Sequence, residues 1–326
     1  MRKTILDLLS GKKIDTQPTF SGLIHITAEG LEREGLVFYE IHQDAGKMAK
    51  AAASTFRLTG MPSATLPLDL CVPAEAMGAE LNYYKGGDLQ FPQVKKALIE
   101  STKDLSTDLP EILTLGRIAM VCEAITLAKN GVGGEVVISG MIPGPYTLLL
   151  YLCNPKNLFI EMKKEPQLVI NALSQLSSFL GKISRAYLNA GADFITIHEM
   201  GGSPGFIGPI KFEQFVLPAL KQLHTEIPAP CVLSVCGNTN TSMHLLAQAG
   251  ADAISVDQTN DLVASRALLK DKLLFGNIDP VQTLWQGDSA QVAESVVRAK
   301  EAGVDAVWPG CDLVVQSPIE NIKSLK

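Results

Sequence analysis

Two cysteines occupy positions in this sequence where thiols could do chemistry. Cys236 follows the hydrophobic run 232–235, and Cys311 comes shortly after the run 306–308. Both runs are typical of buried strands that end in a glycine-containing loop. In a parallel α/β barrel, active sites are built where the strands end. Two thiols at one rim therefore indicate a soft-metal site, a redox pair or a coincidence.

Other polar residues follow predicted strands in the same way. They are Asp69, His198, Glu199, Ser234, Asp257, Gln258, Asn277 and Asp279. Thiolates bind zinc well, and a catalytic zinc keeps one open position, so two cysteines and one nitrogen or oxygen ligand suffice. His198 ends the strand before Cys236 and Asp257 ends the strand after it, so either is a candidate third ligand. Bound zinc would lower the pKa of an incoming thiol or water.

A structural role is the alternative for many of these residue types. No Cys-x-x-Cys occurs, so spacing alone is a weak signal for metal. Four more cysteines are expected to be reduced, mostly buried and structural: Cys71, Cys122, Cys153 and Cys231. Four histidines are expected at the surface or in caps: His25, His42, His224 and His244. Asp69 is equally compatible with capping a turn.

Composition excludes several classes of function. The chain has 326 residues, 46% of them hydrophobic, and a net charge of −6, so nothing indicates a nucleic-acid partner. No apolar stretch approaches the ~20 residues that a membrane span needs. Asp7 interrupts the apolar run near the N-terminus, which does not resemble a signal peptide. A cytoplasmic protein is expected.

The order of predicted elements indicates a barrel. Strands are predicted at 18–25, 64–69, 136–141, 194–198, 231–236, 253–257, 273–279 and 306–308, and helices at 45–59, 166–189, 241–249 and 290–302. A glycine followed by an apolar run recurs at 190–193, 249–252 and 302–305, which is typical of repeated helix-to-strand joints. About eight strands favour one (β/α)8 barrel domain over residues 1–326. The polar segment 83–117 is predicted to pass over the barrel mouth.

Several segments resemble the uroporphyrinogen decarboxylase superfamily. They are Leu68–Gly78, which contains Asp69; Gly140–Leu148; Phe275–Pro280, which contains a Gly-Asn-x-Asp-Pro turn; and Pro318–Ile322. The resemblance spans nearly the whole chain and keeps the family's order. It implies a distorted (β/α)8 barrel whose site lies at the C-terminal ends of the strands. Asp69 and Asn277 are the catalytic side chains that it suggests.

The superfamily includes porphyrinogen decarboxylases and methylcobamide:coenzyme M methyltransferases. The decarboxylases carry arginines near the N-terminus to hold substrate carboxylates, whereas the matching segment 20–25 has none. They also have a Gly-His-Gly where this chain has Gly310-Cys311-Asp312. The methyltransferase branch fits better, because its zinc-binding cysteines match Cys236 and Cys311. An acidic residue near Asp257 completes the zinc shell in that branch.

One position departs from that branch. Its zinc-binding histidine corresponds to Ser234, and a serine hydroxyl is a poor zinc ligand. Three readings stay open: His198 or Asp257 replaces the histidine, the metal binds weakly, or zinc is absent and the acceptor is not a thiol.

The resemblance therefore predicts a methyltransferase that uses a methylated corrinoid. Because the sequence has no corrinoid-binding Asp-x-His-x-x-Gly motif, the methylcorrinoid is expected on a separate corrinoid protein. The acceptor is a small molecule, either a thiol such as coenzyme M or a folate. The alternatives are a decarboxylase of a smaller acid and a non-catalytic barrel that binds a corrinoid or another ligand.

Overall fold

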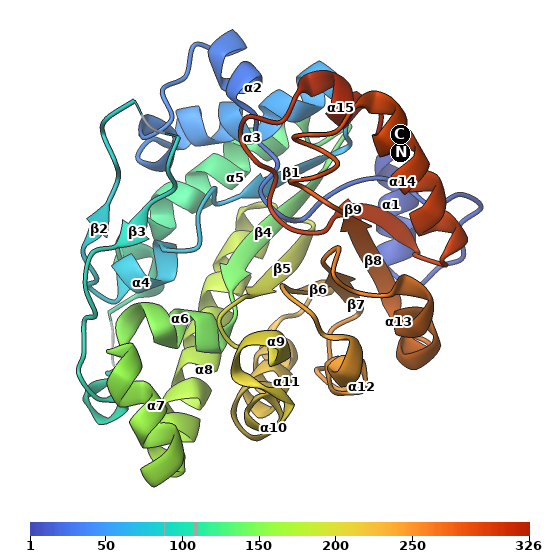
Figure 1. Cartoon of the computed structure of the whole chain (residues 1–326). Helices are drawn as coiled ribbons and strands as arrows, with labels where there is room; N and C mark the ends of the chain where they lie inside the picture. Colours follow the sequence, from blue (N-terminus) through green and yellow to red (C-terminus); the bar gives the residue numbers. More distant parts are fainter. Residues whose placement is uncertain (88, 107–109) are drawn as a thin grey trace.

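A curled parallel sheet surrounded by helices forms the body of the protein (Figure 1). The computed structural model describes residues 1–87, 89–106 and 110–326. Within that part of the chain, the parallel strands follow the order β1-β4-β5-β6-β7-β8-β9. Their bounds are β1 Ser63–Leu66, β4 Val137–Pro143, β5 Phe194–Glu199, β6 Cys231–Val235, β7 Ala253–Val256, β8 Leu273–Ile278 and β9 Ala306–Pro309. The predicted barrel is confirmed, and its strands lie close to the predicted positions.

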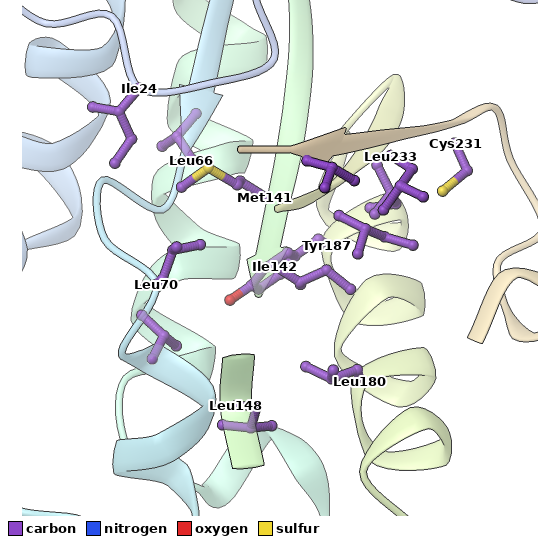
Figure 2. Packing of buried hydrophobic residues seen from close by; sticks show 14 of the residues in the cluster. Ile24, Leu66, Leu70, Met141, Ile142, Leu148, Leu180, Tyr187, Cys231 and Leu233 are labelled. Carbon is purple, nitrogen blue, oxygen red and sulfur yellow. The ribbon is translucent and has the colours of Figure 1, made fainter. Parts of the chain in front are cut away.

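Helices surround the sheet on its outer face and at both ends of the barrel. They are α1 Arg2–Leu9, α2 Ala28–Arg33, α3 Ala45–Thr59, α4 Val72–Ala76, α5 Ile118–Val132, α6 Pro145–Leu152, α7 Pro155–Lys164, α8 Pro166–Ala190, α9 Pro204–Ile207, α10 Pro209–Lys211, α11 Leu217–Glu226, α12 Met243–Leu246, α13 Leu262–Leu269, α14 Ser289–Glu301 and α15 Ile319–Lys323. Figure 2 shows the apolar layer between strands and helices, to which β4 contributes Ile142 and α8 contributes Leu180 and Tyr187. This layer buries the strands on their second face, as a parallel sheet requires.

The predicted first strand is wrong in detail. Residues 18–25 make only one parallel bridge, between Thr19 and Val307 of β9. This segment forms no such bridge with β1 among the described residues. Its hydrogen bond there runs from the Ser21 N–H to the side-chain hydroxyl of Ser63. The reason is the path of the chain, which enters the barrel interior at Gly22. A Cβ on Gly22 would lie 2.7 Å from the ring of Trp308, so only glycine fits there.

The barrel interior changes from apolar to polar along the strands. Its floor consists of Phe20, Val137, Phe194, Val232, Phe275 and Trp308, closed by Ile5, Leu8 and Leu9 of α1. Side chains of a strand alternate, so every second residue of β5 and β6 points inward. Phe194 is followed by Thr196 and His198, and Val232 by Ser234 and Cys236. Each strand thus carries a hydrophobic residue, a hydroxyl and then a metal-binding type of side chain toward its C-terminal end.

The segment predicted to cross the mouth runs along α6 and α7. It starts directly after β2 Leu81–Asn82 and includes β3 Gln93–Val94, the antiparallel partner of β2. Leu98 and Ile99 then hydrogen-bond to the C-terminal turn of α6, and Thr102 to Glu161 of α7. Positions 88 and 107–109 of the predicted excursion lie outside the described residues.

No described helix combines the length and the hydrophobicity that crossing a membrane requires.

Candidate functional site

Three side chains that could bind a metal converge at the C-terminal ends of the strands. Nε2 of His198 lies 3.2 Å from Sγ of Cys236 and 4.0 Å from Sγ of Cys311. The two sulfur atoms are 3.4 Å apart and belong to free thiols. We call these three residues the thiol cluster. They come from β5, from the loop after β6 and from the loop after β9, so the barrel topology alone brings them together.

Local hydrogen bonds fix the loop that carries Cys236. Its carbonyl oxygen accepts a hydrogen bond from the Ser203 hydroxyl, at the N-terminus of α9. The next residue, Gly237, has φ +83°, a conformation that favours glycine, and its N–H donates to Asp257. These contacts turn the chain sharply after β6 and hold the Cys236 thiol over the barrel axis.

The thiol cluster has a shared charge. The hydrogen bond between the two thiols lowers the pKa of Cys311 well below its ordinary value and raises that of Cys236. Burial alone would lower the pKa of His198, but the hydrogen bond to Cys311 and the charge of Asp312 outweigh it and raise the pKa to about 9. These directions favour a thiolate at Cys311 beside a protonated His198. A cation bound by the two sulfurs and the imidazole would take the place of the protons that these groups share.

The spacing of the donor atoms suits zinc. In a tetrahedral site with Zn–S bonds of about 2.3 Å, two sulfur ligands lie roughly 3.8 Å apart. The observed sulfur–sulfur separation of 3.4 Å is somewhat shorter than that value, and Nε2 of His198 lies 3.2 and 4.0 Å from the two sulfurs. Among the described residues, these three form the group whose ligand atoms all lie within 4.8 Å of one another.

Asp257 lies next to the thiol cluster but outside this group. Its Oδ2 accepts the N–H of Gly237, and its Oδ1 accepts the N–H of Thr259 at 2.9 Å and the amide of Asn260 at 3.1 Å. Both carboxylate oxygens are thus engaged by protein groups. Asn277 donates its amide to the carbonyl oxygens of Asp257 and Asn260 at 3.1 and 3.0 Å. The two residues hold the loop that supports Cys236.

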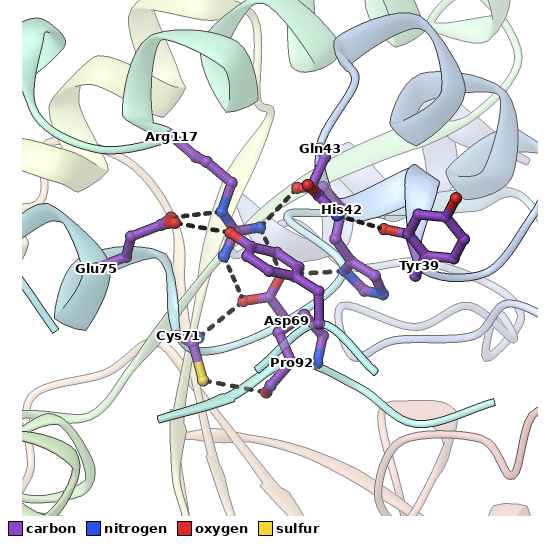
Figure 3. Close-up of polar contacts among 9 residues, drawn as sticks. Tyr39, His42, Gln43, Asp69, Cys71, Glu75, Pro92 and Arg117 are labelled. Carbon is purple, nitrogen blue, oxygen red and sulfur yellow. Dashed lines mark hydrogen bonds and ion pairs between the residues drawn. The ribbon is translucent and has the colours of Figure 1, made fainter. Parts of the chain in front are cut away.

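Asp69 lies at the end of β1, in a separate network of buried charges (Figure 3). Arg117 donates to both of its oxygens, at 2.9 and 3.1 Å, and also contacts Glu75. His42 Nδ1 lies 3.1 Å from Oδ2, and the Cys71 N–H donates to Oδ1 at 2.9 Å. Burial would raise the pKa of Asp69, but the Arg117 charge and the His42 hydrogen bond hold it well below its usual range. We call this group, with Tyr83 against Arg117, the Asp69 network.

The fold and the site can now be compared with known proteins. The whole chain, residues 1–326, matches the family described as Uroporphyrinogen decarboxylase (URO-D). The chain belongs to this family. The membership that the sequence predicted is therefore confirmed.

Within the URO-D family, the chain is similar to methyltransferases. Methylcobamide:CoM methyltransferase MtbA of Methanosarcina acetivorans is 30% identical over 321 residues, which cover 97% of this chain and 94% of the relative. Methylcobamide:CoM methyltransferase MtaA of Methanosarcina barkeri is 30% identical over 327 residues, which cover 100% and 96%. A solved methyltransferase from Methanosarcina mazei has a TM-score of 0.94 at 28% identity and covers 99% of this chain and 96% of its own. The names of these URO-D relatives match the predicted reaction class.

The structure adds residues that the sequence did not single out. Arg117 and His42 complete the Asp69 network, although His42 was expected at the surface or in a cap; both His42 and His25 are buried. Asp312, next to Cys311, faces His198. No spacing motif connects these residues, because they come from distant parts of the chain. The adjacency of Asp312 to Cys311 is the one signal that the sequence contained.

Proposed function

We propose that this chain is a corrinoid-dependent methyltransferase. It would move a methyl group from a methylated corrinoid on a separate protein to a small thiol such as coenzyme M. The thiol cluster is the observation that carries the proposal, because two sulfur donors and one imidazole nitrogen meet within 4.0 Å at the mouth of the barrel. The printed names of the methanogen relatives support the same reaction class.

Zinc is the metal that fits this donor set. His198, Cys236 and Cys311 would supply three ligands and leave the fourth tetrahedral position for the acceptor. Bound there, zinc would lower the pKa of the acceptor thiol and favour its thiolate. The residues' own contribution is orientation: the loops after β6 and β9 aim both sulfurs at His198. The acceptor sulfur then forms its bond to the methyl carbon while cobalt keeps the electron pair of the broken Co–C bond.

We infer that His198 replaces the histidine that is missing at Ser234. In the parallel register, His198 of β5 pairs directly with Ser234 of β6. The imidazole therefore reaches the same corner of the barrel from the neighbouring strand. A complete set of two thiolates and an imidazole favours a thiol acceptor over a folate, whose methylation needs protonation of a nitrogen rather than a soft metal.

We propose supporting roles for Asp257 and Asn277. Because Asp257 accepts the N–H of Gly237, it sets the turn that presents Cys236. Asn277 in turn fixes the backbone of Asp257 and Asn260. Both residues would act on the metal through Cys236 rather than by direct contact.

Asp69 is proposed as a structural residue, which disfavours decarboxylation. Its side chain is 1% exposed, and Arg117, His42 and the Cys71 N–H occupy both oxygens. A decarboxylase of a smaller acid would need this carboxylate to face substrate, and here it faces Arg117 instead.

The surface beside the thiol cluster offers a place for the corrinoid protein. Phe206 and Ile210, on α9 and α10, are 70% and 80% exposed. The Phe206 ring lies 3.8 Å from where a Cβ on Gly237 would be, so it borders the loop of Cys236. A protein that brings cobalt to an acceptor at Cys236 has to cover this rim, and exposed aromatic and aliphatic side chains suit a protein interface.

Zinc content per chain tests the metal site. About one zinc is expected in the unmodified chain, and little in Cys236→Ser, Cys311→Ser or His198→Gln. Cys122→Ser is the matched control, because Cys122 lies on α5, away from the thiol cluster, and zinc should be retained. A chain free of zinc after purification and after incubation with zinc salt would contradict the proposal.

A methyl-transfer assay tests the reaction. Free methylcobalamin and coenzyme M should yield methylated thiol and cob(I)alamin, followed by absorbance under anaerobic conditions. The Cys311→Ser variant should lose this activity, whereas Cys122→Ser should keep it. Ligand binding without turnover by any thiol would favour the non-catalytic alternative, and transfer to a folate alone would reassign the acceptor.

A further inference from the structure

The second ring nitrogen of His198 is a buried polar atom without a partner, as are Nε2 of His42 and Nδ1 of His224 among the described residues, and it has a carboxylate close by. His198 is fully buried, and its Nδ1 has no hydrogen-bond partner among the described residues. The nearest carboxylate oxygen is Oδ2 of Asp312, at 3.9 Å, which is too long for a hydrogen bond. A buried N–H without a partner costs roughly 1–3 kcal/mol of stability. A hydrogen bond between Nδ1 of His198 and Oδ2 of Asp312 would therefore stabilise the folded chain.

Asp312 has one carboxylate oxygen fixed by a hydrogen bond and a second oxygen that, within the described residues, is free to accept the Nδ1–H of His198. Its Oδ1 accepts the N–H of Ile24 at 2.8 Å, which fixes one end of the carboxylate to the N-terminal segment. Its Oδ2 has no hydrogen bond to any described residue and is the oxygen that faces His198. Asp312 also follows Cys311 directly, so a shift of the Cys311 loop moves the carboxylate too. A displacement of about 1 Å would give an ordinary N–H···O distance.

We propose that Asp312 is a positioning residue for His198. On metal loading, its Oδ2 accepts the Nδ1–H, which fixes the tautomer that leaves Nε2 free to bind the metal. The inference rests on the proposed function, because it assumes that His198 is a metal ligand. A carboxylate behind a metal-bound histidine orients the ring and raises its basicity.

Glu199, the other carboxylate near His198 in sequence, does not fill this role. Strand alternation turns it to the opposite side of β5 from His198. Its oxygens accept the N–H groups of Tyr146, Thr147 and Gly202, at the start of α6 and in the loop after β5. Asp312 is thus the carboxylate whose free oxygen faces the ring.

The pairing also explains how histidine can move from β6 to β5. A histidine at position 234 would enter the site from its own strand, whereas His198 comes from the adjacent one. A histidine at position 198 needs a hydrogen-bond acceptor for Nδ1, the ring nitrogen that does not bind the metal. Asp312 provides this acceptor from the loop after β9, which also carries Cys311. The support should therefore matter only while the ligand histidine is at position 198.

Zinc affinity of Asp312→Asn tests the proposal. The side-chain oxygen of the asparagine can still accept the N–H of Ile24. Its NH2 group then faces the Nδ1–H of His198, and because an NH2 group cannot accept this hydrogen bond, the proposed interaction is lost. Competition with a chromophoric chelator should show zinc affinity lowered about 10- to 100-fold. Asp279→Asn is the control: it removes the same charge near the same strand ends, but within the described residues the Asp279 carboxylate accepts the N–H groups of Val281 and Gln282 in its own turn. Equal affinities for Asp312→Asn and the unmodified chain would overturn the inference.

A swap of the histidine makes the test specific. In the double variant His198→Ser with Ser234→His, Asp312→Asn should change zinc affinity less than twofold. A loss as large as in the original background would mean that Asp312 acts by charge alone and would refute a positioning role.

Imidazole NMR gives a readout that does not depend on the swap or on activity. With zinc bound, ¹⁵N shifts should assign Nε2 of His198 as the ligand and show a protected Nδ1–H, whose exchange is much faster in Asp312→Asn. A zinc ligand at Nδ1, or unchanged exchange, would overturn the inference. If the unmodified chain binds no zinc, the proposed function fails first, so the two failures are distinguishable.

Discussion

The Asp69 network and the thiol cluster both lie at or just beyond strand ends, yet they differ in how their charged groups are paired. Both oxygens of Asp69 have partners, and Arg117 joins Asp69 to Glu75. In the thiol cluster, two sulfurs contact each other, and His198 Nδ1 has no partner among the described residues. Within the described residues, Nε2 of His42 also lacks a partner, but protein groups occupy both carboxylate oxygens of Asp69. For the thiol cluster, we propose that a cation engages the donor atoms.

The pairing of a polar residue distinguishes structural from catalytic residues better than its residue type does. An aspartate at the end of a barrel strand is a reasonable catalytic candidate, and Asp69 was one. Its carboxylate is paired with Arg117 inside the protein and does not face a substrate. The comparison predicts that variants of the thiol cluster change the reaction and spare the fold, whereas variants of the Asp69 network do the reverse.

Loss of a thiol ligand should have the largest effect. Cys311→Ala removes one of three proposed ligands, so methyl transfer to coenzyme M should fall at least ~1000-fold, which corresponds to about 4 kcal/mol. The unfolding free energy of the metal-free protein should change by less than about 1 kcal/mol, because the thiol is only partly buried. Steady-state kinetics and urea unfolding measure both. A large stability loss with activity retained would reverse the comparison.

Breaking the Asp69 network should destabilise the fold. Asp69→Asn removes one of the two carboxylate partners of the buried Arg117 and leaves Glu75 as the other, and breaking a buried pair typically costs about 3–5 kcal/mol. The matched control is Glu294→Gln, which breaks an exposed pair with Arg298 and should cost at most about 1 kcal/mol. Denaturant unfolding should separate the two variants, and the zinc content of Asp69→Asn should equal that of the unmodified chain. Zinc loss in Asp69→Asn would show that the two regions are coupled.

The two regions should also respond to pH with opposite signs. Asp69 has a lowered pKa, so its contribution to stability is present above the unfolded value of about 4 and fades as the pH falls below it. Burial raises the pKa of Asp312 to about 6, so its ionisation costs stability as the pH rises from about 4 to 6. In metal-free protein at pH 8, Asp69→Asn should therefore be less stable than the unmodified chain, and Asp312→Asn more stable.

Unfolding measured from pH 3 to pH 8 checks these signs. Both differences should shrink toward pH 3, where the two carboxyls are protonated in the unfolded chain and Asp312 is protonated in the folded one. Equal signs for the two variants at pH 8 would contradict the environments described here.

Strand positions and the two cysteines could be predicted from the sequence, because apolar runs that end in glycine-containing loops are local signals. The partner of the cysteines could not be chosen, since His198 and Asp257 both end neighbouring strands. That choice depends on which oxygens are already engaged: Gly237 and Asn260 occupy Asp257 and leave His198 facing the sulfurs. The path of residues 18–25 was also hidden, because their alternation is that of a strand, whereas Gly22 takes them into the barrel.

The smallest effect is expected at the rim, where it tests whether the thiol cluster works with a protein partner. Replacing Phe206 and Ile210 by alanine removes two exposed apolar side chains, of which Phe206 borders the loop of Cys236. Loss of a central interface residue costs about 2 kcal/mol, so kcat/KM with a methylated corrinoid protein should fall about 10- to 50-fold. Transfer from free methylcobalamin should stay within twofold, and Val297→Ala, an exposed residue on α14, should change neither rate. If both donors slow equally, Phe206 and Ile210 support the thiol cluster itself, and the corrinoid protein approaches from another side of the mouth.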